Sequence, residues 1–294
     1  MTSVAVVGPG AIGSTVAAWL AQDDRLDVTL CARTPVEHLE IETPEGMIRA
    51  TLPVLTDPGI ASLVDWVILA VKAYDVDAAS PWLTGLVGQG TQVAVLQNGV
   101  EHLERVSPYV PLERILPVVV DIPAERLSPG HVRQRSAGTL IVPSGAAGRA
   151  FVDLFVHTVI EASVTDDFVT TAWKKLSLNA AGAISAVLGQ PSGIAHQESI
   201  AELIRTVVGE AVLVGRAEGA NLADDLPDEV LDRMRATPPL FVNSLQADRM
   251  AGRPTEVDVR NGVVVRKGAV HGIPTPANAV LFALIGVTPV DGTR

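Results

Sequence analysis

One segment at the N-terminus limits what this chain can fold into more than any other. An apolar run over residues 3–7 leads into Gly8-Pro9-Gly10-Ala11-Ile12-Gly13, and an apolar-faced segment follows over residues 14–20. This order predicts a buried strand, a G-x-G-x-x-G turn and a helix. In such a unit the first glycine allows a tight turn, the second lets a pyrophosphate approach the backbone, and the third lets the helix pack on the strand. We therefore predict a dinucleotide-binding unit; the alternative is a glycine-rich turn of another kind of α/β protein.

The size and charge of the chain narrow the remaining classes. Its 294 residues are enough for two domains, and its one cysteine, Cys31, can form no internal disulfide. We see no zinc-ligand spacing, no secretory signal and no apolar run of the ~20 residues that a membrane helix needs, so we expect a cytoplasmic protein. A net charge of −11 disfavours binding to nucleic acid or to an anionic membrane. Because a dinucleotide is also anionic, its site needs local arginine or lysine side chains.

A second strand, predicted over residues 27–32, bears on the choice of dinucleotide. Units that bind NAD carry an Asp or Glu about 20 residues after the glycines, where the carboxylate accepts a hydrogen bond from the ribose 2′-hydroxyl. Here the strand ends in Cys31 and Ala32, and Arg33 follows. A guanidinium can hold a 2′-phosphate through two parallel hydrogen bonds, so the sequence favours NADP(H). The alternative for Arg33 is an ordinary solvated surface residue.

Two further polar residues stand where predicted strands end. Continuous apolar runs over residues 65–71 and 91–96 predict buried parallel strands. Since ligands of open α/β sheets bind at the carboxyl ends of the strands, Lys72 and Asn98 are candidate cofactor contacts, unless they are ordinary loop residues. Short β-like segments between residues 114 and 143 predict the trailing, partly antiparallel edge of the same sheet.

The periodicity becomes helical after residue 165. We predict a Rossmann-type doubly wound sheet domain that binds NADP over residues 1–165, and an all-α substrate and dimerisation domain over residues 166–294. A helix predicted over residues 170–186 places Lys175 and Asn179 on one face, because they are four residues apart. That face is otherwise small and apolar, which makes Lys175 a candidate general acid. The alternative is that its side chain reaches the solvent.

The C-terminal third contains one more candidate site residue. A long helix predicted over residues 195–219 carries an apolar stripe typical of core packing. Pro254 fits the first turn of a later helix that would also contain Glu256. Two interpretations of Glu256 stay open: its carboxylate favours the positive end of the helix dipole, or it projects into a cleft and binds a substrate hydroxyl.

Together these segments resemble the ketopantoate reductase family, the NADPH-dependent 2-dehydropantoate 2-reductases. The resemblance rests on the glycine turn, Leu96-Gln97-Asn98-Gly99, Trp173-Lys174-Lys175-Leu176 with Asn179, Gly252-Arg253-Pro254-Thr255-Glu256, and His271-Gly272-Ile273-Pro274-Thr275-Pro276. It implies that an oxidoreductase uses NADP(H) to reduce a 2-keto acid, ketopantoate or a relative, to the 2-hydroxy acid.

The resemblance also implies roles for individual residues at the cofactor. The glycine turn would hold the pyrophosphate, and Arg33 would meet the 2′-phosphate. Lys72 and Asn98 would contact the ribose and nicotinamide region, which Glu256 would also approach.

The resemblance implies a second set of roles at the substrate. Lys175 would be the general acid that protonates the ketone oxygen as the hydride arrives. Asn179 would hold the substrate, and Ser244 would contact its carboxylate. Glu256 would bind the substrate hydroxyl or orient Lys175.

The sequence departs from the family pattern at two places. A second asparagine usually follows the first by four residues, but Ala183 stands four residues after Asn179. The family's Pro-Asn-Gly appears here as Pro191-Ser192-Gly193. A hydrogen bond contributes roughly 0.5–1.5 kcal/mol, so these losses would move substrate preference without abolishing the chemistry. We therefore hypothesise a reductase of this family whose natural substrate is either ketopantoate or a relative of it.

Two other functions remain open from the sequence. One is another NADP-dependent two-domain dehydrogenase that acts on a β-hydroxy acid, an opine or an imine. The other is a non-catalytic NADPH-binding sensor, which would have no need of a proton donor such as Lys175. We favour the enzyme, without a metal, and expect a homodimer.

Overall fold

The computed structural model describes residues 1–287, and the chain separates into two compact units. The first unit contains residues 1–97 and 102–168. The second contains residues from 169 onward together with the four-residue segment Asn98–Glu101, which follows a strand of the first unit in sequence.

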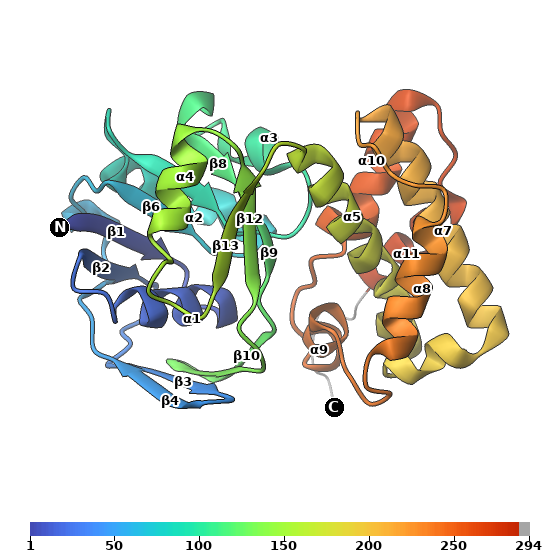
Figure 1. The fold of residues 1–294 in the computed structure, drawn as a ribbon, viewed down its shortest axis with the longest axis horizontal. Helices are drawn as coiled ribbons and strands as arrows, with labels where there is room; N and C mark the ends of the chain where they lie inside the picture. Colours follow the sequence, from blue (N-terminus) through green and yellow to red (C-terminus); the bar gives the residue numbers. More distant parts are fainter. Residues whose placement is uncertain (288–294) are drawn as a thin grey trace. The chain divides into compact units, whose positions relative to one another are not determined.

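A six-stranded parallel sheet forms the centre of the first unit (Figure 1). Its spatial order is β5-β2-β1-β6-β7-β8. The strands are β1 Thr2–Val7, β2 Leu26–Cys31, β5 Val54–Leu55, β6 Trp66–Leu69, β7 Gln92–Val95 and β8 Ile115–Pro117. The chain order reverses beside β1, because β2 pairs with one of its edges and β6 with the other. This is the strand order of a doubly wound dinucleotide-binding sheet, and it confirms the predicted fold class of the N-terminal part.

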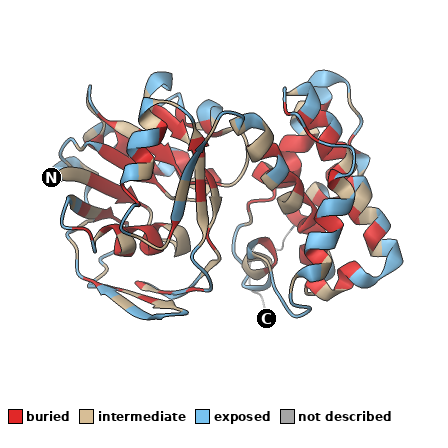
Figure 2. Ribbon diagram, in the orientation of Figure 1, coloured by how far each residue is buried: buried red, intermediate tan, exposed pale blue. Residues whose placement is uncertain are grey.

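Helices cover both faces of this sheet. Along β1, Val4 and Val6 pack on one face in a cluster with α1 (Ala11–Leu20) and α4 (Ala146–Asp153). Ala5 and Val7 pack on the other face with α2 (Val76–Leu86). Because side chains alternate along a strand, a central strand with apolar residues on both sides must be buried on both faces. Figure 2 shows these strands as buried.

The region between residues 114 and 143 differs from the prediction. Only β8 joins the large sheet, and the other segments build two smaller sheets of order β10-β11-β3-β4 and β13-β12-β9. Their strands are β3 Leu39–Thr43, β4 Gly46–Ala50, β9 Val119–Asp121, β10 Ala124–Ser128, β11 His131–Gln134, β12 Thr139–Pro143 and β13 Glu161–Thr165. β8 ends at Pro117, and the last backbone bond to the large sheet is donated by the Val118 N–H to the Val95 carbonyl over 3.3 Å. A short helix, α3 (His102–Val106), precedes β8.

The second unit is helical, as predicted. It contains α5 Phe168–Ala181, α6 Ala183–Leu188, α7 Glu198–Ala217, α8 Leu226–Ala236, α9 Ser244–Met250, α10 Val263–His271 and α11 Pro276–Gly286. The single helix predicted over residues 170–186 is two helices, broken at Gly182. There the side chain of Asn243 donates to the Gly182 carbonyl over 3.0 Å. None of the helices within residues 1–287 combines the length and apolar character that a membrane crossing requires.

The prediction of a helix that starts at Pro254 is wrong. Residues 254–257 are irregular, and the helical backbone begins with a π-helical turn, Asp258–Gly262, that runs directly into α10. The carbonyl of Val257 accepts from the backbone N–H groups of both Asn261 and Gly262, at 2.9 and 3.0 Å, which sets this wider turn. Glu256 therefore precedes the helix, and its first-turn interpretation does not hold.

Candidate cofactor and substrate sites

The glycine turn follows β1 directly. Gly8 adopts a φ of +104°, which disfavours any residue with a Cβ. A Cβ on Gly13 would lie 2.0 Å from the Gly8 carbonyl oxygen, so this position needs glycine for close packing of helix on strand. A Cβ on Gly10, in contrast, would meet no atom within 4 Å among the described residues. The second glycine thus faces open space, where a ligand can approach the backbone.

The start of α1 offers hydrogen-bond donors to such a ligand. Gly10 is the N-cap residue, and within residues 1–287 no side chain caps this helix end. Pro9, Ala11 and Ile12 are half-buried around it. Uncapped N–H groups and the positive end of the helix dipole form a site for phosphate. The residues present therefore fit a dinucleotide pyrophosphate.

Arg33 and Lys72 occupy the places that their strands predict. Arg33 lies two residues after the end of β2, and its side chain is 83% exposed, with Nη2 at 4.0 Å from Asp75 Oδ2. This contact is at the limit of an ion pair, so it leaves the guanidinium able to reach an anion. Lys72 is half-buried and immediately precedes the 3-10 helix Ala73–Asp75.

Three predicted site residues form a chain of hydrogen bonds in the helical unit. Asn98 Nδ2 donates to Glu256 Oε2 over 2.9 Å. Asn179 Nδ2 donates to Asn98 Oδ1 over 3.3 Å. Glu256 is buried, whereas Asn98 and Asn179 are half-buried. The structure thus brings together residues from three separate parts of the sequence.

Lys175 lies one turn before Asn179 on α5. It is half-buried, while its neighbour Lys174 is exposed. Lys175 is thus more enclosed than its neighbour on the same helix.

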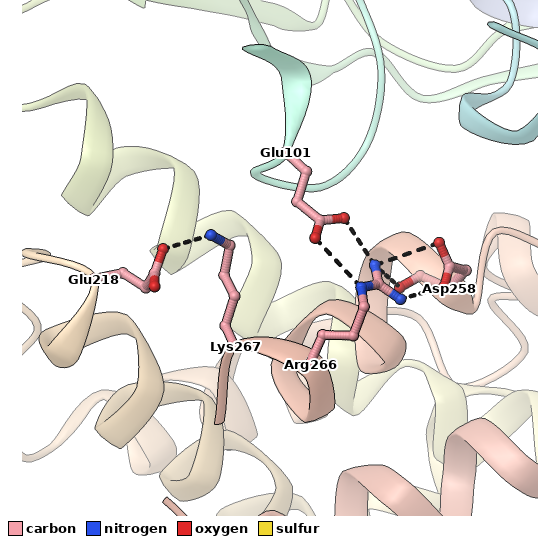
Figure 3. A network of polar contacts seen from close by, with 5 residues as sticks. All are labelled: Glu101, Glu218, Asp258, Arg266 and Lys267. Carbon is pink, nitrogen blue, oxygen red and sulfur yellow. Dashed lines mark hydrogen bonds and ion pairs between the residues drawn. The ribbon is translucent and has the colours of Figure 1, made fainter. Parts of the chain in front are cut away.

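The segment that carries Asn98 is fixed by an ion-pair cluster (Figure 3). Arg266 on α10 contacts Glu101, with Nη2 at 2.7 Å from Oε2, and it also pairs with Asp258 in the π-helical turn. In the same region, Lys267 Nζ lies 2.6 Å from Glu218 Oε2. Since Glu101 is three residues after Asn98, the Arg266 contact helps to place the Asn98 amide.

Ser244 is hydrogen-bonded to Arg260, a residue that was not predicted from the sequence. Ser244 is the exposed first residue of α9, and its Oγ accepts a 2.8 Å hydrogen bond from Arg260 Nη2. Arg260 is only 3% exposed, in the π-helical turn. Burial lowers the pKa of its guanidinium, and the carboxylates of Glu256 and Asp248 oppose that effect. The sequence gives little signal for it, because Arg260 stands in a valine-rich segment, residues 257–265, that also contains the polar residues Asp258 and Asn261.

The two departures from the family pattern have structural roles. Ala183 is fully buried in the core of the helical unit. Ser192 is also buried, and its Oγ donates to the Pro238 carbonyl over 2.7 Å. Both positions therefore take part in the packing of the helical unit. In residues 1–287 no group of three or more His, Cys, Asp or Glu side chains is arranged to hold a metal ion.

A Rossmann-type unit with an uncapped glycine turn, followed by a helical unit that carries a buried carboxylate beside two amides, defines a two-domain dinucleotide-dependent oxidoreductase. The chain belongs to the ketopantoate reductase family. Residues 4–146 match the family model "Ketopantoate reductase PanE/ApbA", and residues 167–288 match "Ketopantoate reductase PanE/ApbA C terminal". The resemblance found in the sequence is thereby confirmed, as is its implication that the protein is an oxidoreductase.

Individual relatives agree with this assignment. A 2-dehydropantoate 2-reductase of Caulobacter vibrioides is 57% identical over 285 residues, which cover 97% of this chain and 98% of that protein. A ketopantoate reductase from Ralstonia eutropha JMP134 is 31% identical, with a TM-score of 0.88 over 97% of this chain and 98% of that one. A dimeric ketopantoate reductase from Staphylococcus aureus is 26% identical, again with a TM-score of 0.88, over 97% and 98% of the two chains.

Proposed function

We propose that this protein reduces ketopantoate to the corresponding 2-hydroxy acid with NADPH. The observation that carries the proposal is the hydrogen-bonded chain Asn179–Asn98–Glu256, one helical turn from Lys175, in a chain that is 57% identical to a 2-dehydropantoate 2-reductase. The 57% identity to that reductase over 97% of this chain favours ketopantoate itself over a relative.

The first unit holds the cofactor in this proposal. Ketopantoate reductases use NADPH. The open space at Gly10 and the uncapped start of α1 suit the pyrophosphate, and the exposed Arg33 suits the 2′-phosphate. Lys72 follows β6 at the carboxyl edge of the sheet and suits the ribose region. When bound, NADPH supplies the hydride that reduces the keto carbon.

The second unit supplies the proton and the substrate contacts. Negative charge develops on the keto oxygen during reduction, so a cationic donor at that atom stabilises the transition state more than the ground state. Lys175 is this donor, and it protonates the oxygen. Asn179 holds the substrate on the same helix face, and Ser244 contacts its carboxylate. Glu256, held by Asn98, binds the substrate hydroxyl or orients Lys175.

We infer that residues 1–165 form the domain that binds the cofactor and residues 166–294 the domain that binds the substrate. The last seven residues of the second domain lie outside the described part of the chain.

We also propose a homodimer. The relative from Staphylococcus aureus is described as dimeric. On the helical unit here, Leu188, Val280 and Leu284 are exposed around one apolar pocket. A cytoplasmic location is proposed as well, and the single buried thiol of Cys31 suits a reducing compartment.

Lys175→Ala, compared with Lys174→Ala, tests the enzyme against the other functions. We expect Lys175→Ala to lower kcat for ketopantoate by about 10²–10⁴-fold, because it removes the proton donor. The exposed Lys174 is a matched control on the same helix, and its variant should keep full activity. NADPH affinity, measured by fluorescence titration, should be unchanged in both. Tight NADPH binding without turnover by the wild type would favour the sensor, and efficient turnover of an imine or β-hydroxy acid alone would favour the other dehydrogenases.

A further inference from the structure

Arg260 is a buried cation that the proposed mechanism does not use. Its Nη2 donates to Ser244 Oγ, whereas its buried Nε has no hydrogen-bond partner in the part of the chain that the structure describes. Leaving a buried donor unpaired is unfavourable, and so is burying the charge itself. An arginine at this position therefore needs an explanation beyond packing.

We propose that Arg260 is a positioning residue for the substrate carboxylate and acts through Ser244; the inference rests on the proposed reduction of a 2-keto acid. A serine hydroxyl has one proton to donate. Because Ser244 Oγ already accepts from the guanidinium, its own proton points away from Arg260. Ser244 is exposed, so this proton is available to an anion outside the protein core.

The positive charge of Arg260 also favours binding of the substrate carboxylate. The substrate is an anion, and the site that receives it contains the buried carboxylate of Glu256. In the proposed mechanism Lys175 interacts with the keto oxygen and not with the substrate carboxylate. A second fixed cation is therefore needed to offset the repulsion between the substrate carboxylate and the Glu256 carboxylate. The carboxylates of Glu256 and Asp248 both attract the Arg260 guanidinium, whose Nη2 donates to Ser244 Oγ. Arg260 thus raises the affinity for an anionic substrate without contacting it.

A purely structural role makes a different prediction. If Arg260 only locks the start of α9 onto the π-helical turn, its loss lowers stability and affects every substrate alike. A neutral analogue separates the two roles. Ketopantoyl lactone keeps the reacting ketone but has no carboxylate, so its reduction does not depend on an anion site.

The experiment measures kcat and KM for ketopantoate and for its lactone with wild type, Arg260→Gln, Arg260→Lys and Ser244→Ala. We expect Arg260→Gln to raise KM for ketopantoate by about 10- to 100-fold, with kcat and the lactone kinetics changed by less than about threefold. Arg260→Lys should recover part of the loss, because it restores the charge without the planar guanidinium. Arg216→Met, which removes a structural arginine bound to the Leu222 carbonyl, is the control and should leave both substrates unaffected.

Ser244→Ala keeps the test decisive if Arg260→Gln does not fold. The residue is exposed, so its truncation should preserve the fold and should raise KM for ketopantoate in the same selective way. Equal losses for acid and lactone, or an unchanged KM for ketopantoate in Arg260→Gln, would overturn the role of Arg260; if that variant does not fold, an unchanged KM in Ser244→Ala would do so. Wild-type turnover is measured first: its absence would overturn the proposed function and this inference together, whereas turnover with unchanged KM in the variants would overturn only the inference.

Discussion

The Asn98 amide and the Glu256 carboxylate, 158 residues apart in sequence, are joined by a 2.9 Å hydrogen bond in which Asn98 Nδ2 is the donor. Asn98 Oδ1 accepts from Asn179, so both ends of the amide are engaged and only one orientation satisfies both partners. This bond links the turn after β7 to the segment that precedes the π-helical turn. It fixes the carboxylate that the proposed mechanism requires.

Substitutions at Asn98 test this relationship. Asn98→Ala removes a charge-assisted hydrogen bond that contributes roughly 1.5–3 kcal/mol, so we expect kcat/KM for ketopantoate to fall about 10- to 100-fold. Asn98→Asp should be worse than Ala, because it places a second carboxylate against Glu256. Steady-state kinetics of the two variants give the comparison. An Asp variant as active as wild type would show that the bond has no part in the reaction.

Glycine substitutions test the cofactor turn. Gly10→Ala should fold normally, since its Cβ meets open space, but should raise the Kd for NADPH about tenfold or more by occupying the approach of the pyrophosphate. Gly13→Ala should lower Tm as well, because its Cβ would lie 2.0 Å from the Gly8 carbonyl oxygen. Gly90→Ala, also in open space, is the control and should change neither quantity. Unaltered NADPH affinity in Gly10→Ala would argue against this binding mode.

Arg33→Ala tests the choice between NADPH and NADH. Loss of a guanidinium–phosphate contact should lower kcat/KM with NADPH about 10- to 100-fold and leave the value with NADH nearly unchanged. Arg49→Ala removes another exposed arginine, ion-paired with Glu40 in the same unit, and should preserve the NADPH preference. If Arg33→Ala weakens both cofactors equally, the residue does not read the 2′-phosphate.

His102 predicts a loss of stability in mild acid. Burial lowers the pKa of this imidazole below its ordinary 6.5, although its Nε2 contacts the Gln97 carbonyl oxygen at 2.9 Å. The unfolded chain therefore binds the proton more readily. Above about pH 6.5 the imidazole is neutral in both states and His102 does not reduce the free energy of unfolding. As the pH falls from there toward the lowered pKa of the folded state, protonation of the unfolded chain reduces that free energy. We expect urea unfolding to show about 1 kcal/mol less stability at pH 5.5 than at pH 7.5 from this residue. His102→Gln should remove that part of the difference; an identical pH dependence in the variant would contradict the prediction.

The sequence predicts those parts of the structure that are determined by residues close together in the chain, and it does not predict those determined by contacts between distant residues. The strand, turn and helix around Gly8–Gly13 could be predicted because every constraint lies within one short segment. The helix start at Pro254 could not, because a proline suits any first turn. The backbone bonds to the Val257 carbonyl and the contact between Glu256 and Asn98 decide the outcome.

Contacts between distant parts of the chain produce the features that the sequence does not predict. Arg260 has its hydrogen-bond partner 16 residues earlier, on another helix, and no spacing rule connects the two. The sheet of β3, β4, β10 and β11 joins segments more than 80 residues apart, whereas the parallel strands of the central sheet are revealed by their own apolar runs. Fold class and single site residues are thus predictable here, but the contacts among those residues are not.

The most direct measurement is kcat/KM of the wild type for ketopantoate, followed by the loss of NADPH absorbance beside a panel of other 2-keto acids. We predict a value within the usual enzyme range of about 10⁴–10⁸ M⁻¹s⁻¹, at least about tenfold above every other acid in the panel. Tight NADPH binding with no turnover of ketopantoate would contradict the proposed reductase function.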